Sequence, residues 1–194
     1  MKKEFITAVL LLALGAPGAL TVANAQAKAD EKPTFAAVYD RLLGGTEKEV
    51  VSAAEAMPED KFNFAPPTNL GEFKGVRTFA QQVKHIAGAN YMLGAGILGE
   101  KPPAAAGGED GPANLNSKAD VVKYLKDSFE YLHKALATVN ETNIMEKVQS
   151  PFGPNKVTRL ALATIAVSHP QDHYGQMVEY LRMNGIIPPA SRAQ

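Results

Sequence analysis

The sequence predicts an all-α protein, a four-helix bundle. Four long segments carry apolar residues at the spacing of an amphipathic helix, and they are bounded by capping residues, glycine or proline. Alternating, strand-like runs are weak, and the best of them are residues 61–64 and 147–149. The predicted helices are residues 34–57, 78–98, 117–140 and 158–184.

The N-terminal segment, residues 1–27, is predicted to be a secretory signal peptide that precedes the bundle domain, residues 28–194. Two lysines precede an apolar run, and the small residues that follow in an A-x-A pattern predict cleavage after Ala25 or Ala27. A membrane anchor is the alternative, but the strongly apolar part, residues 5–14, is too short to span a bilayer. We therefore expect an exported protein, periplasmic or secreted, with no stable membrane anchor after cleavage.

The first two predicted helices have clear boundaries. Thr34 follows a proline and is a suitable N-cap for the first helix, which Pro58 ends. Thr78 and Gln81 have the spacing of a capping box at the start of the second helix. Both helices contain glycines that lower their intrinsic stability, so we expect packing to stabilise them.

The last two predicted helices are bounded in the same way. Ser117 and Asp120 resemble a capping box, and Gly185 is a suitable C-cap for the fourth helix. Pro170 lies inside the fourth helix and removes one backbone hydrogen bond. It predicts either a kink in one helix or the start of a new helix.

The connections between the helices, residues 58–77, 99–116 and 141–157, are long. The second is rich in glycine, proline and alanine. It could cross the full length of a bundle, because extended chain covers about 3.3 Å per residue. Loop length therefore leaves open both the topology and whether this loop covers a site.

The composition excludes several functions. The chain has 20 basic and 20 acidic residues, so it lacks the basic excess that general nucleic-acid binding needs, and we expect no nucleic-acid partner. It has no cysteine, which excludes disulfides, a thiol nucleophile, cysteine metal ligands and a lipid anchor on cysteine. A homodimer through helix faces is compatible with the sequence, but no feature demands one.

The histidines are the strongest candidates for chemistry. His169 and His173 lie about 40° apart around a helix, and they point toward its apolar face. A metal ion would satisfy two imidazoles there, but an H-x-x-x-H pattern alone is a weak indicator. By spacing, His85 lies on the flank of the second helix, and His133 lies off the core face of the third. Each of these two also fits a surface histidine.

The helix RTFAQQVKHIAGAN carries a single histidine, and SHPQDHYGQMVEYLRMNGIIPPAS carries the histidine pair followed by Gly-Gln. In their order along the chain, these motifs and the segment NFAPP resemble the DinB-like superfamily, in particular its exported members. The resemblance covers residues 34–191 and implies an up-down-down-up four-helix bundle. It also implies a divalent metal ion bound by His85, His169 and His173, whereas His133 matches no ligand position. Tyr174 stands where many relatives have a second histidine or an arginine, which puts a basic residue's role there in doubt.

Three imidazoles leave coordination positions open for water or substrate, as in catalytic sites and unlike closed structural sites. Zn²⁺ in such a site can lower the pKa of bound water to about 7. Nitrogen ligands suit Zn, Ni, Cu or Fe, so the ligand type does not identify the metal. Asn90, Asp172 and Gln176 are candidates for contacts behind the ligands, although the position of Asp172 also fits a solvent-facing residue.

The resemblance implies metal-dependent hydrolysis of an unknown small molecule, or thiol transfer. Export makes thiol transfer the weaker of the two, because small thiols belong mainly to the cytoplasm. No dedicated general base is evident in the sequence. A non-catalytic metal-binding or interaction protein is therefore the main alternative, and an empty site is a third.

Overall fold

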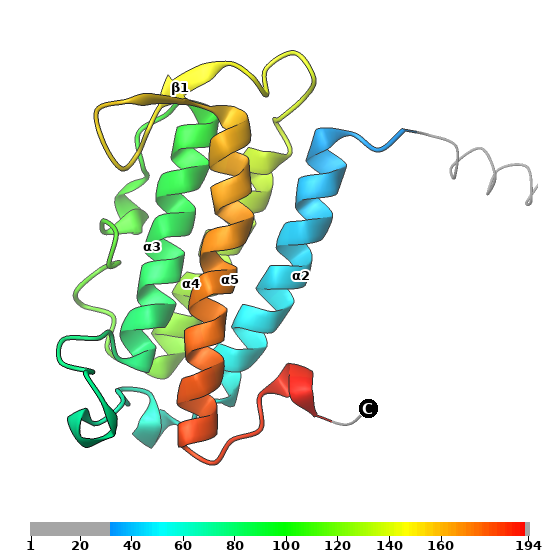
Figure 1. The fold of residues 1–194 in the computed structure, drawn as a ribbon. Helices are drawn as coiled ribbons and strands as arrows, with labels where there is room; N and C mark the ends of the chain where they lie inside the picture. Colours follow the sequence, from blue (N-terminus) through cyan, green and yellow to red (C-terminus); the bar gives the residue numbers. More distant parts are fainter. Residues whose placement is uncertain (1–31, 193–194) are drawn as a thin grey trace, which may run out of the picture. The chain divides into compact units, whose positions relative to one another are not determined.

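Four helices dominate the part of the chain that the computed structural model describes, residues 32–192. The predicted signal peptide lies outside these residues. The all-α four-helix prediction is confirmed (Figure 1). The helices are α2 (Phe35–Ala56), α3 (Phe79–Leu98), α4 (Lys118–Leu136) and α5 (Arg159–Met183).

Each helix begins after a capping serine or threonine. The side chains of Thr34, Thr78, Ser117 and Thr158 each accept a hydrogen bond from a backbone N–H three residues later. At the end of α3, Gly99 adopts φ 75°, a left-handed conformation that glycine reaches without steric cost. The helix boundaries therefore follow from local sequence.

The helices run up-down-down-up (Figure 1), the topology that the resemblance implied. α3 and α4 are parallel, because Asn90 donates a hydrogen bond to Ser128 and, one turn later, Gly94 packs against the ring of Tyr131. α2 and α5 run in the opposite direction to this pair. A parallel pair needs a connection that returns the chain to the starting end, and the long second loop provides it.

This second loop, residues 99–117, runs back along α3 and packs against its backbone. A Cβ atom at Gly88 of α3 would lie 2.7 Å from the carbonyl oxygen of Glu109. Further along the loop, Asp110 forms an ion pair of 3.0 Å with Arg77, just before α3 begins. The loop therefore covers the first half of α3.

A short antiparallel ribbon formed by β1 (Lys147–Gln149) and β2 (Lys156–Thr158) precedes α5, with Val148 opposite Val157. One of the two weak strand-like pieces in the sequence, residues 147–149, is therefore a strand.

The other strand-like piece, residues 61–64, is not a strand. Glu59–Lys61 forms a 3-10 helix. The carbonyl oxygens of Phe62 and Phe64 then accept hydrogen bonds from Ala80 and Phe79, the first two residues of α3. These backbone groups satisfy a helix N-terminus, so they do not pair with another strand.

α5 is one helix that passes through Pro170. Of the two outcomes predicted for this proline, a new helix beginning at residue 170 is therefore not observed. His169 and His173 remain on the same helix, one turn apart. Among residues 32–192, no helix is both long enough and apolar enough to cross a membrane.

Candidate metal centre

Three histidines from two helices meet between α3 and α5. His85 comes from α3, and His169 and His173 come from α5. Each offers a ring nitrogen within 4.8 Å of those of the other two. Their ring centroids lie 4.6 to 5.0 Å apart. The one-turn spacing on α5 and the antiparallel packing of α3 produce this convergence.

The ring of His85 is held by the second loop. Its Nδ1 lies 3.0 Å from the carbonyl oxygen of Glu109, which can only accept, so Nδ1 carries the proton. Its Nε2 is therefore unprotonated and faces Nε2 of His169 at 3.1 Å. His85 is only 4% exposed. The surface position that its spacing suggested is wrong, because the loop covers it.

The ring of His173 is held by a chain of side-chain hydrogen bonds. Its Nδ1 donates to Oε1 of Gln82 at 2.6 Å. Nε2 of Gln82 donates to Oε1 of Gln176 at 2.8 Å, and Nε2 of Gln176 donates to Asp172 at 3.3 Å. This chain fixes the tautomer of His173 and leaves its Nε2 free, as in many metal-binding histidines.

His169 lacks such a partner. Its Nδ1 is buried and makes no hydrogen bond within the described residues. A buried polar nitrogen without a partner is costly. A metal ion bound at Nε2 would leave Nδ1 as it is, so the fit to a metal depends on the Nε2 atoms. The 3.1 Å between the Nε2 atoms of His85 and His169 fits two ligands that each lie about 2.1 Å from one ion. The residues present therefore fit a divalent metal.

The three histidines have the protonation state that binds a cation at neutral pH. The pKa values of His169 and His173 are lowered to about 4, first by burial and then by neighbouring imidazoles and Arg77, while Asp172 opposes the shift. Burial, followed by the charge of Arg77, also lowers the pKa of His85. All three rings are therefore neutral near pH 7, which is the form that binds a metal.

Comparison with known proteins agrees with this architecture. A model of the DinB superfamily matches residues 42–177.

The chain belongs to the DinB superfamily.

A solved DinB-like protein from Bacillus subtilis has the same fold, with a TM-score of 0.57, although only 18% of residues are identical. The match covers 80% of this chain and 99% of that one. No curated protein matches the chain in sequence. DinB-superfamily members bind divalent metal ions, and the three histidines could form such a site.

The other predicted residues of this DinB-superfamily bundle are distributed unevenly around the histidines. Gln176 and Asp172 join the hydrogen-bond chain behind His173. Asn90 is fully buried, but its side chain bonds to Ser128 of α4 and not to a histidine.

His133 lies apart from the other histidines, between α4 and α2. Its ring contacts Asp40 at 2.6 Å and Glu47 at 3.2 Å.

Two groups that contact the clustered histidines, the Gln82 side chain and the Glu109 carbonyl, were not among the residues predicted from the sequence. Gln82 precedes His85 by three residues and so shares its helix face, a spacing that could have identified it. The carbonyl of Glu109 could not be found in this way, because every residue has a carbonyl and only the path of the loop selects this one.

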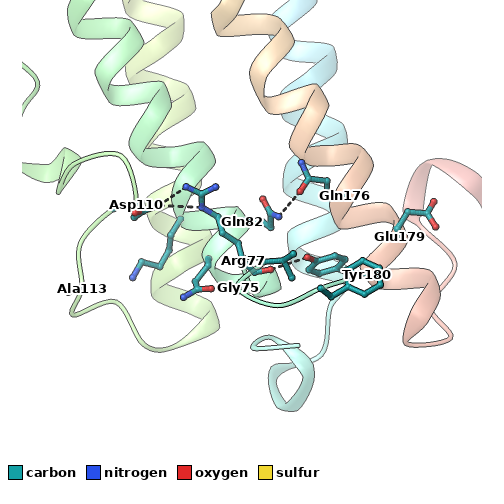
Figure 2. Close-up of a pocket in the computed structure, with 13 residues that line it drawn as sticks. Gly75, Arg77, Gln82, Asp110, Ala113, Gln176, Glu179 and Tyr180 are labelled. Carbon is teal, nitrogen blue, oxygen red and sulfur yellow. Dashed lines mark hydrogen bonds and ion pairs between the residues drawn. The ribbon is translucent and has the colours of Figure 1, made fainter. Parts of the chain in front are cut away.

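A pocket of about 900 Å³ lies beside the histidines, between the start of α3 and the end of α5 (Figure 2). Gln82 and Gln176 form part of its wall, and Arg77, Asp110 and Tyr180 line it as well. Because Gln82 also binds His173, one side chain links the pocket to the histidine cluster.

Proposed function

We propose that this chain is an exported DinB-superfamily protein that binds a divalent metal ion through His85, His169 and His173, and that it hydrolyses a small-molecule substrate there. The observation that carries the proposal is the convergence of three neutral imidazoles. Protein acceptors already occupy the Nδ1 atoms of His85 and His173, so the Nε2 atoms of these two rings are free to bind a metal.

When bound by three imidazoles, a divalent metal supplies Lewis acidity and lowers the pKa of coordinated water to about 7. The chain's own groups contribute orientation and shielding. The Glu109 carbonyl and Gln82 hold two of the rings, and the 99–117 loop covers the α3 side of the cluster. The adjoining pocket offers room for a substrate.

A metal-binding protein without catalysis is the second candidate. The groups that hydrogen-bond to the histidines are a backbone carbonyl and the Gln82 amide, and neither takes up a proton at neutral pH. The nearest carboxylates are Asp110 and Glu109, 3.7 and 3.9 Å from Nδ1 of His85, and Asp172 behind His173. All three are exposed, and among residues 32–192 none forms a hydrogen bond with a histidine of the cluster, so no general base is held there.

The metal site is tested by elemental analysis of the purified mature protein and its variants. We expect about one metal ion per chain in the wild type and a large loss in His85→Ala and His173→Ala, because each removes one of three ligands. His133→Ala is the control and should keep its metal. Equal metal content in all four proteins would refute the site.

The reaction is tested by assaying the metal-loaded protein against ester, amide and thiol-conjugation substrates. Hydrolysis that is lost in His173→Ala supports the first candidate. Conjugation of thiols would indicate a thiol transferase instead. Inactivity on every panel, with the metal bound, favours metal binding without catalysis.

Export is tested by expressing the full chain in a Gram-negative bacterium and determining the N-terminus of the product by mass spectrometry. We expect a mature protein in the periplasm that begins at residue 26 or 28, after Ala25 or Ala27. An uncleaved protein in the cytoplasm would contradict export while leaving the metal site untouched.

A further inference from the structure

The pocket beside the histidines carries two cationic side chains near its wall, Arg77 and Lys84. The backbone of Arg77 is anchored, because its carbonyl accepts a hydrogen bond of 3.0 Å from the Tyr180 hydroxyl. Its guanidinium binds Asp110 through Nε and Nη2. Figure 2 shows Arg77 held between these two partners. The side chain is thus positioned before any ligand arrives.

Both cations retain unused donors. Among residues 32–192, Nη1 of Arg77 and Nζ of Lys84 make no hydrogen bond, and Lys84 forms no ion pair. Arg77 is 37% exposed, so its free edge is accessible. Free donors on a positioned guanidinium are suited to bind a planar anion.

We propose that this pocket binds the carboxylate of a small monoanionic molecule, with Arg77 as the main partner and Lys84 as the second, and that this molecule is the substrate class of the histidine site. That this molecule is the substrate rests on the proposed function. That the pocket binds it does not, because Arg77 and Lys84 are separate from the three histidines proposed to bind the metal.

The charges in the pocket favour a monoanion over a phosphate ester. Asp110 and Glu179 also line it, so two acidic groups accompany the two cations. Because the two cations and the two acidic groups balance, each negative charge on a ligand also meets repulsion from both carboxylates, and a dianionic phosphate meets more of it than a monoanionic carboxylate. A carboxylate needs only one guanidinium edge and one ammonium group.

The remaining wall favours an apolar body on the ligand. Phe73, Val76 and the ring of Tyr180 line the pocket, and the Tyr180 hydroxyl is already bonded to Arg77. An aromatic or aliphatic group could pack on these side chains while the carboxylate contacts the cations.

The pocket also reaches the histidines. Gln82 and Gln176 line it, and Gln82 accepts the hydrogen bond from His173. Arg77 and Gln82 line the same pocket, so a ligand anchored at Arg77 would extend along the Gln82 wall toward the histidines.

The test uses isothermal titration calorimetry with three probes that each carry a phenyl ring: N-acetylphenylalanine, its neutral amide, which differs only in the charged group, and phenyl phosphate. We expect N-acetylphenylalanine to bind at least about tenfold more tightly than the other two, since a hydrogen bond to a charged group is worth roughly one order of magnitude in affinity. Equal binding of the neutral amide would overturn the proposal, and so would tighter binding of phenyl phosphate.

Four variants locate the binding. Arg77→Gln should weaken N-acetylphenylalanine by about tenfold, and Lys84→Gln by about threefold. Lys134→Gln removes a lysine of α4 that pairs with Glu130, and it should change nothing. Asp110→Asn frees the guanidinium from its carboxylate and should tighten binding, a gain that damage to the fold cannot produce. Unchanged affinity in both Arg77→Gln and Asp110→Asn would refute the role of Arg77.

Each titration is repeated on metal-free protein, because a carboxylate can also bind a metal directly. Binding that persists without metal and depends on Arg77 supports the pocket, even if the chain proves inactive in the substrate panels. Binding that requires metal and ignores Arg77 would overturn the pocket while leaving the metal site intact.

Discussion

Gln82 has two roles at the scale of single residues. Its side-chain oxygen accepts a hydrogen bond from His173, and its amide NH₂ donates one to Gln176 at the wall of the pocket. It therefore sets the tautomer of one ligand while forming part of the surface that a substrate would contact. Spacing on one helix could predict His169 and His173 as a pair, and could place Gln82 on the face of His85. The contact of Gln82 with His173 depends on α3 lying antiparallel to α5, which no local pattern encodes.

We predict that Gln82→Leu weakens metal binding by about ten- to hundredfold, the usual cost of removing a partner behind a histidine ligand. The metal dissociation constant, measured by competition with a chromophoric chelator, checks this. Ser128→Ala is the control, because it removes a buried hydrogen bond to Asn90 and touches no histidine. If both variants kept the wild-type metal affinity, the hydrogen bond to His173 would have no role in metal binding.

The pKa values of the histidines predict an acid-sensitive metal-free protein. His169 and His173 have pKa values of about 4 in the fold, against an ordinary 6.5. Between these values the unfolded chain binds more protons, so the stabilising contribution is complete above pH 6.5 and is lost as the pH falls toward 4. We expect a loss of roughly 2 to 4 kcal/mol over this range, discounted for the partial exposure of His169.

Urea unfolding of the metal-free protein at several pH values measures this loss. The double variant His169→Gln/His173→Gln keeps every carboxyl group of the protein. Its free energy of unfolding should therefore change less with pH. Parallel curves for the two proteins would rule out the histidines as its cause.

At the scale of elements, the 99–117 loop and α3 form one unit. The loop packs so closely on Gly88 that a Cβ there would lie 2.5 Å from the carbonyl oxygen of Gly108. The helix boundaries could be predicted, because each depends on a cap within a few residues. The path of the loop could not, because it depends on the parallel pairing of α3 and α4 and on the close packing of the loop on Gly88.

We predict that Gly88→Ala destabilises the fold by about 1 to 3 kcal/mol, since the new methyl group must displace backbone. It should also weaken metal binding, because the displaced loop carries the carbonyl that holds His85. Gly44→Ala in α2 is the matched control. Nothing lies within 4 Å of a Cβ there, so it should stabilise the protein by about 0.5 to 1 kcal/mol. Chemical unfolding would report both changes, and destabilisation by both substitutions would contradict the argument from the loop.

At the scale of the whole molecule, the three clustered histidines connect the first and second halves of the bundle. His85 and His169 are separated by 84 residues, and both must be in place for the cluster to exist. The family and the four-helix architecture could be predicted from ordered motifs. The closure of the loop over the site depends on contacts between distant segments.

We predict that zinc at a free concentration of about 100 times its dissociation constant stabilises the fold by about 2.7 kcal/mol. The corresponding rise in melting temperature is roughly 5 to 10 °C for a domain of this size. Calorimetry with and without zinc measures the shift. His173→Ala should abolish most of it, whereas His133→Ala should retain it, and an equal rise in all three proteins would indicate non-specific binding.

The parallel pairing of α3 and α4 also affects how the chain folds. Bundles with short hairpin connections gain most of their contacts locally, whereas here α3 meets α4 through residues 38 apart and α2 meets α5 through residues 125 apart. Contacts between distant residues slow folding, because the intervening chain must first be closed into a loop. The histidine cluster cannot assemble until the last helix has docked on α3. A refolding chain should therefore bind metal only after the native bundle has formed. The time course of metal binding would then measure the completion of folding.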